Sequence, residues 1–275
     1  MQKRLKHIEK EKILDLYNAN LNCTQIALKY GVSCQAIYQF LKRKGVALKT
    51  QSELQRKYSL DETVFETIGN EKKAYFLGLL YADGYIYKKK NTISLSLQDK
   101  DLDIVSSFQT FLNSNRPLLT ICYPNPSWRP QYRLVVQSPR IIKDLEKLGC
   151  TQNKTFTLKF PSLHFELNPH FIRGYFDGDG SVWVLNRKSC KSNLYANLMG
   201  NKEFLEDLIK IVPIDCKAHI RKQRSIYSLD FSCKNAIRFL EWLYSNASIY
   251  GSRKHNNYNA SLNILRLGME SLASA

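Results

Sequence analysis

The stretch FLGLLYADGYI, from Phe76 to Ile86, returns in altered form as FIRGYFDGDGSV, from Phe171 to Val182. Each copy is an apolar run that closes with an acidic residue followed by glycine. The two acids are Asp83 and Asp179, which are 96 positions apart. A segment that occurs twice with its acid in the same place predicts a duplicated structural unit and one site built from both copies.

Both runs predict helices. Asn70 and Asn168 precede them as candidate N-caps, and a proline directly after Asn168 suits a first helical position, so the second start is the cleaner one. Each helix is expected to end at the acid, where the following Gly84 or Gly180 would let the chain leave with positive φ.

One face of each predicted helix is almost bare backbone. Small residues return after four positions, Gly78 with Ala82 and Gly174 with Gly178, so two such faces can press closely together. Apolar neighbours would cover the other sides, which predicts buried helices packed as a pair related by an approximate twofold axis.

This packing would bring the two carboxylates side by side at the C-terminal ends of the helices. That location is unfavourable, because the helix dipole is negative there and like charges repel. A divalent cation between the carboxylates removes the conflict, and oxygen ligands suit Mg²⁺. Metals held by paired carboxylates activate water against phosphodiesters.

These segments resemble the LAGLIDADG homing endonucleases in their single-chain form with two motif copies. The motif matches at LGLLYADG (77–84) and IRGYFDGDG (172–180). The resemblance implies that Asp83 and Asp179, helped by the carbonyls of Ala82 and Gly178, hold two or three Mg²⁺ ions, for which Mn²⁺ may substitute, and that no protein nucleophile takes part. Asp177 has Tyr81 as its counterpart, so it is expected to make a local contact instead.

The repeat continues beyond the motif. TISLSLQDKDLDIVSSFQTFL (92–112) answers NLYANLMGNKEFLEDLIKIV (193–212), and YRLVVQSPRIIKDLEKLG (132–149) answers YSLDFSCKNAIRFLEWLY (227–244). The expected fold is α+β: pseudo-twofold tandem αββαββα repeats, covering 70–160 and 161–275. The resemblance implies that their two antiparallel sheets form a saddle over DNA.

The resemblance also implies a polar pair near the end of the second strand of each repeat. Its counterparts are Gln98 with Lys100 and Asn201 with Lys202, which would orient solvent and stabilise charge on phosphate. Strand-end capping and solvated charge are nearly equal alternatives for these four residues. Lys254 resembles a basic DNA-contacting position that follows the last helix in some relatives.

The side chains of the strands would recognise the DNA sequence. Side chains at every second position share a sheet face, so basic, amide and aromatic groups can follow one groove of the duplex. A slip of one residue would reverse the face. The candidates are Tyr85, Lys89, Arg129, Gln131, Arg133, Trp183 and Arg187.

Composition agrees with a nucleic-acid partner. The 275 residues carry a formal net charge of +17, which favours a polyanion, although ribosomal or membrane-surface binding would fit the charge equally well. Seven cysteines without metal-ligand spacing indicate reduced thiols in a cytosol-like compartment, cytoplasmic or organellar, and zinc is not expected. No apolar run approaches membrane-spanning length and no signal peptide is visible.

The first 60 residues have a separate character, with a net charge of +8. The stretch TQIALKYGVSCQAIYQFLKRKG (24–45) resembles a helix-turn-helix DNA-binding domain, placed at 1–48 and followed by a linker at 49–69. Ser33 is a plausible N-cap of its second helix. A small helical cap with a solvated basic face is the alternative. The outward-facing candidates for DNA contact are Gln35, Tyr38, Gln39 and Lys42.

The sequence thus predicts a monomeric, Mg²⁺-dependent, site-specific endonuclease that makes a staggered cut in a long asymmetric DNA target, with no obligate protein partner. Two alternatives stay open. One is a non-cleaving binder of the same fold, such as an intron maturase or a transcriptional regulator. The other is a repressor in which the N-terminal domain does the binding and the remainder only dimerises.

Overall fold

A computed structural model describes residues 10–19, 21–46, 48, 57–187, 190–213 and 215–273, with the side chains of 186–187, 190–192 and 265–273 left aside. The chain divides into two compact units, Met1–Ser59 and Leu60–Ala275.

In the described residues of the smaller unit the chain forms the helices α1 (Lys10–Asn18), α2 (Cys23–Tyr30) and α3 (Cys34–Arg43). Gly31 ends α2 with φ +66°, and Ser33 then caps α3 by accepting a hydrogen bond from the Ala36 amide, as the sequence predicted. The helices enclose a small apolar core of Ile13, Tyr17, Ile26, Ala27, Val32, Ile37, Phe40 and Leu41.

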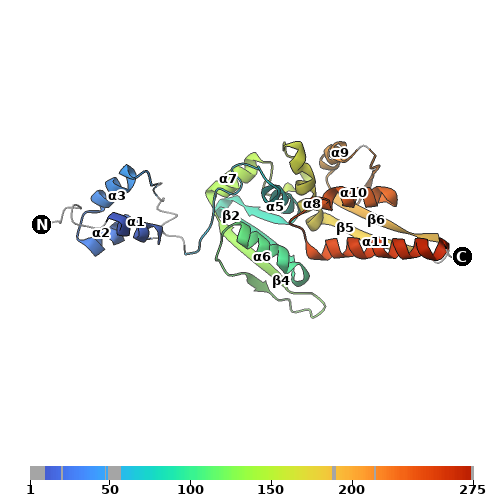
Figure 1. Ribbon diagram of the computed structural model, residues 1–275, viewed down its shortest axis with the longest axis horizontal. Helices are drawn as coiled ribbons and strands as arrows, with labels where there is room; N and C mark the ends of the chain where they lie inside the picture. The colour runs from blue at the N-terminus through green and yellow to red at the C-terminus, as the bar shows by residue number, and fades with distance from the viewer. Residues whose placement is uncertain are drawn as a thin grey trace. The chain divides into compact units, whose positions relative to one another are not determined.

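The larger unit runs through the expected αββαββα order twice, which confirms the α+β tandem-repeat fold (Figure 1). The first repeat has α5 (Glu71–Ala82), β1 (Gly84–Tyr87), β2 (Thr92–Gln98), α6 (Leu102–Phe111), β3 (Leu119–Ile121), β4 (Gln131–Gln137) and α7 (Pro139–Lys147). The second has α8 (Asn168–Asp179), β5 (Gly180–Arg187), β6 (Cys190–Gly200), α9 (Lys202–Ile211), β7 (His219–Gln223), β8 (Ile226–Ser232) and α10 (Lys234–Tyr244). The helix α11 (Ser252–Ala273) follows, and short 3-10 turns η2 (Lys88–Lys90), η3 (Asp99–Asp101), η4 (Lys154–Phe156) and η5 (Phe165–Leu167) join the elements.

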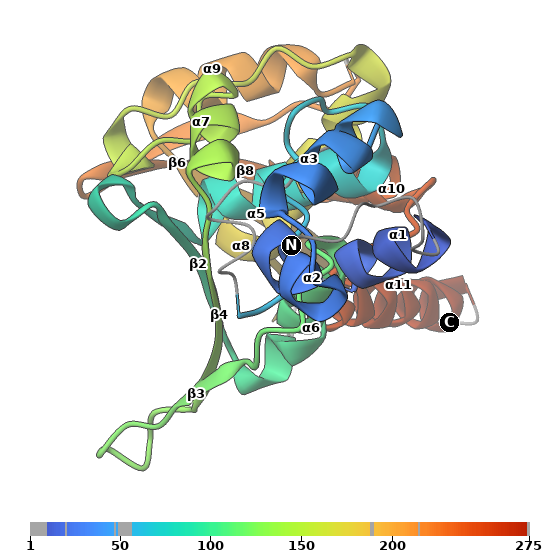
Figure 2. The same cartoon turned by 90° about the vertical axis from the view of Figure 1, so that its left-hand side faces the viewer.

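Each repeat forms one four-stranded antiparallel sheet, in the orders β1-β2-β4-β3 and β5-β6-β8-β7. Helices cover one face of each sheet: α6 and α7 pack on the first, and α9, α10 and α11 pack on the second. Figure 2 shows α6 on one side of β2 and β4. The face away from the helices is called the open face below.

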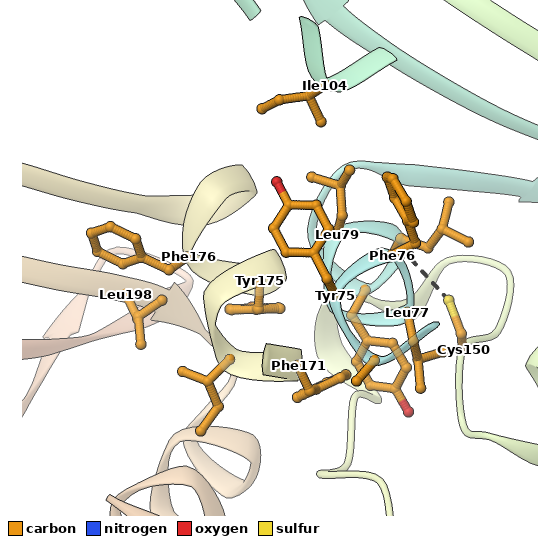
Figure 3. Close-up of a cluster of buried hydrophobic side chains, with 14 of the residues drawn as sticks. Tyr75, Phe76, Leu77, Leu79, Ile104, Cys150, Phe171, Tyr175, Phe176 and Leu198 are labelled. Carbon is orange, nitrogen blue, oxygen red and sulfur yellow. Dashed lines mark hydrogen bonds between the residues drawn. The ribbon is translucent and has the colours of Figure 1, made fainter. Parts of the chain in front are cut away.

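The helices α5 and α8 lie against each other at the centre of this unit and bury most of their side chains, as expected (Figure 3). A Cβ built on Gly78 would lie 1.9 Å from the carbonyl oxygen of Phe171, and one on Gly174 would lie 1.9 Å from that of Tyr75. Backbone therefore meets backbone along the small-residue faces. Aromatic rings such as Phe76 and Tyr175 fill the space on either side.

Two expectations about the helix ends are wrong. Asn168 is the first residue of α8 and not its cap, and its side-chain Oδ1 is buried without a hydrogen-bond partner, whereas Asn70 does cap α5. Neither Gly84 nor Gly180 has positive φ. These two glycines instead allow neighbouring atoms to pack closely against the backbone. A Cβ at Gly84 would lie 2.5 Å from the Leu80 oxygen, and a Cβ at Gly180 would lie 2.2 Å from the Phe176 ring.

The expected linker at 49–69 also ends earlier than proposed. Residues 49–56 lie outside the described part of the chain, and the larger unit begins at Leu60. Val64 and Phe65 are 5% and 1% exposed and belong to the core of that unit. Their burial makes this segment part of the folded repeat region.

Candidate functional site

The two repeated acids come together where α5 and α8 end. Asp83 is the C-terminal cap of α5, and Asp179 is the last residue of α8. A Cβ built on Gly178 would lie 2.3 Å from the Cβ of Ala82 and 2.9 Å from Oδ2 of Asp83. The missing side chain of Gly178 therefore leaves the space that the Asp83 carboxylate occupies.

The pKa values of both acids are raised, as expected for two carboxylates placed close together. Loss of hydration raises the pKa of Asp179 to about 6, and the neighbouring Asp83 carboxylate adds to the rise. Protein atoms packed around Asp83 also raise its pKa, while Lys254 and Lys154 lower it. Asp83 nevertheless keeps an exposed surface and Asp179 is half-buried. The pair is crowded by protein and still reachable from outside.

Two lysines stand beside the acids, and both come from segments that follow the last helix of a repeat. Lys154, in η4, donates a hydrogen bond to the carbonyl of Gly84. Lys254, in the first turn of α11, donates to the carbonyls of Phe176, Asp177 and Gly178 at 2.6, 2.7 and 2.9 Å. Burial lowers the pKa of Lys254 to about 8.

The sequence reasoning missed Lys154, and it misjudged Lys254. Lys254 was expected to contact DNA, but its side chain is 5% exposed and its ammonium is taken up by carbonyls at the end of α8. The repeat itself held the signal for Lys154, because that residue follows the first repeat's last helix as Lys254 follows α10. Comparing the segments after the last helix of each repeat would have identified Lys154 as the counterpart of Lys254.

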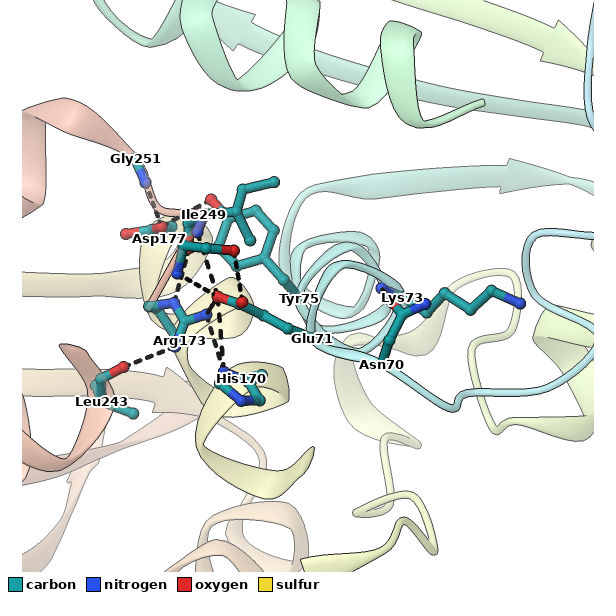
Figure 4. A network of polar contacts seen from close by, with 11 residues as sticks. Asn70, Glu71, Lys73, Tyr75, His170, Arg173, Asp177, Leu243, Ile249 and Gly251 are labelled. Atoms are coloured by element: carbon teal, nitrogen blue, oxygen red, sulfur yellow. Dashed lines mark hydrogen bonds and ion pairs between the residues drawn. The ribbon is translucent and has the colours of Figure 1, made fainter. Parts of the chain in front are cut away.

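A buried polar network holds the start of α11 against the two central helices (Figure 4). The Arg173 guanidinium, with 0% of its side chain exposed, donates to Glu71 Oε1 at 2.6 Å and to the carbonyls of Leu243 and Ile249. Glu71 also accepts from the Ser248 amide at 2.7 Å and the Ser248 hydroxyl at 2.6 Å. The segment that leads to Lys254 is thereby tied to α5 and α8.

Asp177 belongs to this network, which agrees with the local contact expected for it. Its Oδ2 accepts from the Tyr75 hydroxyl at 2.7 Å and from the Gly251 amide at 2.6 Å. Burial raises its pKa to about 6. Farther along, Arg253 makes a two-pronged ion pair with Asp101, so α11 is anchored to both repeats.

The four residues of the expected polar pairs do not converge on the acids through any contact among the described residues. Asn201 caps α9 by accepting from the Phe204 amide, and its Nδ2 donates to the carbonyl of Leu158. Lys202 is exposed and pairs with Glu206 at 3.4 Å. Lys100 is exposed in η3, and Gln98 is exposed at the end of β2. For Asn201 and Lys202 the structure favours capping and solvated charge.

The open face of the first sheet carries part of the expected DNA-contact set. Because directly paired antiparallel residues share a face, Tyr85, Gln131 and Arg133 lie together opposite the buried Leu95 side. Gln98, which was expected in the catalytic centre, lies on the same face. Two expectations are wrong here. Lys89 lies in η2 and not on β1, and Arg129 precedes β4, where it pairs with Asp99 at 3.3 Å.

The open face of the second sheet carries Trp183, which stacks on Tyr195 with ring centroids 5.6 Å apart. Arg187 ends β5 after a register shift, and its side chain lies outside the described residues. The same face holds residues that the sequence reasoning did not name, among them Asn197, Arg221, Ser228 and Asp230. Strand register decides their face, and register was not readable from the sequence.

In the smaller unit, α3 exposes the side chains expected to contact DNA. The buried residues of α3 are Ile37, Phe40 and Leu41, and they belong to the apolar core of this unit. The exposed residues of the same helix include Gln35, Tyr38, Gln39 and Lys42.

Within the described part of the chain, no group of three or more His, Cys, Asp or Glu side chains is arranged around a common metal position. Among the described residues, the acidic centre is therefore the pair Asp83 and Asp179. Among the same residues, none of the helices has the length and hydropathy that crossing a bilayer requires.

No protein-family model and no curated protein matches the chain. Among solved structures, the LAGLIDADG meganuclease I-AabMI bound to uncleaved DNA aligns with a TM-score of 0.51 and 14% identity, over 74% of this chain and 92% of that chain. I-LtrWI, a LAGLIDADG homing endonuclease bound to target DNA, aligns at 0.49 and 14%, over 77% and 92%. Meganuclease I-SmaMI, bound to uncleaveable DNA, aligns at 0.48 and 14%, over 71% and 89%. The first likeness shows a shared fold.

Proposed function

We propose that this chain, which has the fold of the LAGLIDADG homing endonucleases, is a site-specific endonuclease acting on double-stranded DNA. The observation that carries the proposal is that Asp83 and Asp179 lie close together at the C-terminal ends of α5 and α8, with one lysine from each repeat beside them. Carboxylates held together with raised pKa values favour a catalytic role over a purely structural one.

The residues present fit a divalent cation with oxygen ligands. Two accessible carboxylates and the carbonyl oxygens of Ala82 and Gly178 would hold Mg²⁺, which takes few protein ligands and keeps several waters. The Gly178 carbonyl also accepts a hydrogen bond from Lys254, so the cation would share that oxygen with the ammonium or displace it. The absence of a side chain at Gly178 leaves room beside Asp83 Oδ2. When bound, such ions supply Lewis-acid polarisation of the phosphate and activation of water. Two or three ions are expected, with Mn²⁺ able to substitute.

The chain's own groups then have separate tasks. The carboxylates of Asp83 and Asp179 provide negative charge at the centre of the unit, and relief of their repulsion favours binding of cations. The charges of Lys154 and Lys254 lower the pKa of both acids and so favour the ionised carboxylates that a cation requires. Because one acid and one lysine come from each repeat, two strands can be cut at separate positions, which gives a staggered break.

DNA binding would use the open faces of the two sheets. They carry amide, basic and aromatic side chains, among them Gln131, Arg133 and Trp183, and the excess of positive charge favours a polyanion. The side chains differ between the two sheets, which favours a long asymmetric target read by a single chain. The exposed side of α3 would add contacts in a major groove.

The test uses the purified full chain with a plasmid library that carries randomised target sites. The wild type should linearise a subset of plasmids in Mg²⁺ and leave them intact in EDTA. The double variant Asp83→Asn plus Asp179→Asn should still bind the selected site and should cut it at least about 1,000-fold more slowly. Cutting at the wild-type rate by the double variant would reject the proposed site.

A second candidate is a repressor in which the smaller unit does the binding. It is favoured by one observation, namely that α3 exposes a polar side on a separate compact unit. Deletion of residues 1–59 distinguishes the two. A nuclease should keep weakened cutting, whereas a repressor should lose all specific binding. A maturase-like binder would bind without cutting in either form.

A further inference from the structure

A chain of hydrogen bonds on the open face of the second sheet ends in an exposed arginine. Arg221 lies on β7 directly opposite Ser228 of β8. Its Nε donates to Asp230 Oδ2 at 3.0 Å, while the Ser228 hydroxyl donates to the other oxygen of the same carboxylate. Asn197 of β6 donates to the Ser228 hydroxyl at 3.4 Å. Three neighbouring strands thus support one guanidinium.

The position of Asp230 needs a physical reason. A carboxylate on a face that approaches a polyanion is repelled by phosphate, so by itself it weakens DNA binding. The side chain of Asp230 is 27% exposed, and both of its oxygens are engaged. A carboxylate held in this way neutralises the arginine in part and restricts its rotamers. It therefore suits orientation better than general attraction.

The exposed end of the arginine has the geometry for reading a base. The side chain of Arg221 is 64% exposed. With Nε engaged by Asp230, the two terminal Nη groups make no hydrogen bond to any other residue that the structure describes. Two parallel N–H donors on a planar fork match the N7 and O6 acceptors of guanine in the major groove.

We propose that Arg221, held by Asp230, recognises a guanine in the half of the target that lies under the second sheet. The inference rests on the proposed function, since it requires that the open faces bind DNA. It adds a specificity-determining residue and the identity of one base. Support by Asp230 reduces the entropy that the side chain loses on binding, so discrimination against other bases is expected to be strong at this position.

The strand offers a matched control. Lys222 is the next residue along β7 and is also exposed, but it pairs with Tyr227 and so lies on the other face of the sheet. Lys222→Ala removes a positive charge from the same strand and leaves the Arg221 guanidinium in place. Any change in base preference that Arg221→Ala causes and Lys222→Ala does not cause is specific to the open face.

The experiment selects bound sites from a randomised duplex library with the full-length wild type and with each variant, in EDTA so that no cleavage intervenes. The wild type should select a guanine at one position where Arg221→Ala selects no base. On single sites, replacing that guanine should weaken wild-type binding about 5- to 150-fold and should change binding by Arg221→Ala less than about twofold.

Two further variants separate charge from geometry. Arg221→Lys keeps the charge but lacks the fork, so the guanine preference should fall while binding to random-sequence DNA is kept. Asp230→Ala should lower the preference while binding to random-sequence DNA stays equal or rises, because a negative charge has been removed. Lys222→Ala should keep the preference.

Selection of the same bases at every position by wild type and Arg221→Ala would overturn the inference and leave the proposed function standing. Loss of preference for a base other than guanine would overturn it too. A wild type that selects no sequence at all would reject the proposed function, and the inference with it.

Discussion

Gly78 and Gly174 meet the opposite helix in the same way. Each glycine faces the carbonyl oxygen of the residue three positions before the other, Phe171 for Gly78 and Tyr75 for Gly174, at 1.9 Å from an ideal Cβ. The equivalence follows the 96-residue offset of the two copies. The central contact is therefore symmetric at the level of backbone atoms, and the two acids inherit that symmetry.

Substituting either glycine should separate the helices. Gly78→Ala and Gly174→Ala place a methyl group against backbone, which cannot move aside as a flexible side chain can, and each should cost about 3 kcal/mol or more of unfolding free energy. Gly69→Ala is the control, since a Cβ there meets nothing within 4 Å. Urea denaturation measures all three, and equal stabilities would contradict the described packing.

Removal of Glu71 should destabilise the larger unit strongly. In Glu71→Ala the Arg173 guanidinium stays buried without its carboxylate, and unpaired buried charges of this kind cost about 3–5 kcal/mol. Glu206→Ala removes the acid of the exposed Lys202–Glu206 pair and should change stability by less than about 0.5 kcal/mol. Chemical denaturation at pH 7 compares them.

The Glu71 contribution also has a defined pH dependence. Burial alone would raise the pKa of Glu71, but the Ser248 hydrogen bonds and the charge of Arg173 lower it overall. A carboxyl group whose folded-state pKa is depressed stabilises the fold above its unfolded value near 4.3, and this stability is lost as pH falls through the folded value. The cost of Glu71→Ala should therefore shrink when unfolding is measured below about pH 4.

Asp179 should behave in the opposite sense. Its pKa is raised to about 6 in the folded protein, so the unfolded chain releases this proton first as pH rises from about 4. The free energy of unfolding therefore falls between about pH 4 and pH 6 and stays lower at higher pH. In EDTA, Asp179→Asn should melt above wild type at pH 8 and together with it at pH 4, as followed by circular dichroism. A melting temperature of Asp179→Asn below that of the wild type at pH 8 would contradict this assignment.

Mg²⁺ should reverse the order of the two proteins. A cation that binds the folded state alone raises the melting temperature, and the carboxylates must be ionised to hold it. At pH 8 the wild type should gain stability with added Mg²⁺, and Asp83→Asn plus Asp179→Asn should gain none. A gain of equal size in both proteins would place the cation elsewhere.

Lys254→Met should impair cleavage more than binding. The variant loses three hydrogen bonds to the C-terminal carbonyls of α8 and the charge that lowers the pKa of Asp83. We expect about 100-fold slower cleavage, with the acidic limb of the pH–rate profile moved to higher pH because Asp83 would ionise later. Lys202 is exposed and pairs with Glu206, so Lys202→Met should leave both the cleavage rate and the pH–rate profile unchanged.

The fold was readable from the sequence because its signals are local and occur twice. The spacing of Gly78 with Ala82 and of Gly174 with Gly178 predicted the close helix pair, and the continued repeat predicted both sheets. The conformation of Gly84 and Gly180 was misjudged, since an Asp-Gly helix end usually marks positive φ. Here the glycines are required by contacts with Leu80 and Phe176 side chains and carbonyls, which a local pattern does not reveal.

The outer parts of the site depended on three-dimensional placement. Asn201 could be a solvent-orienting group or a helix cap, and only its contact with the Phe204 amide separates these roles. Lys254 could be exposed or buried, and the outcome depends on how the segment at 248–251 is held by Glu71 and Asp177. These contacts join residues up to 178 positions apart along the chain.

The sequence by itself determined that two equivalent helices would pack closely and carry Asp83 and Asp179 to one place, because residue size and spacing along a helix control that packing. Only the tertiary structure decided which cations stand beside those acids and which side chains share an open face. The contacts of Lys154 and of the Arg173–Glu71 pair depend on the path of segments 70 and 102 positions apart. The Arg221–Asp230 pair depends on the register of β7 against β8, which the sequence of either strand alone does not fix.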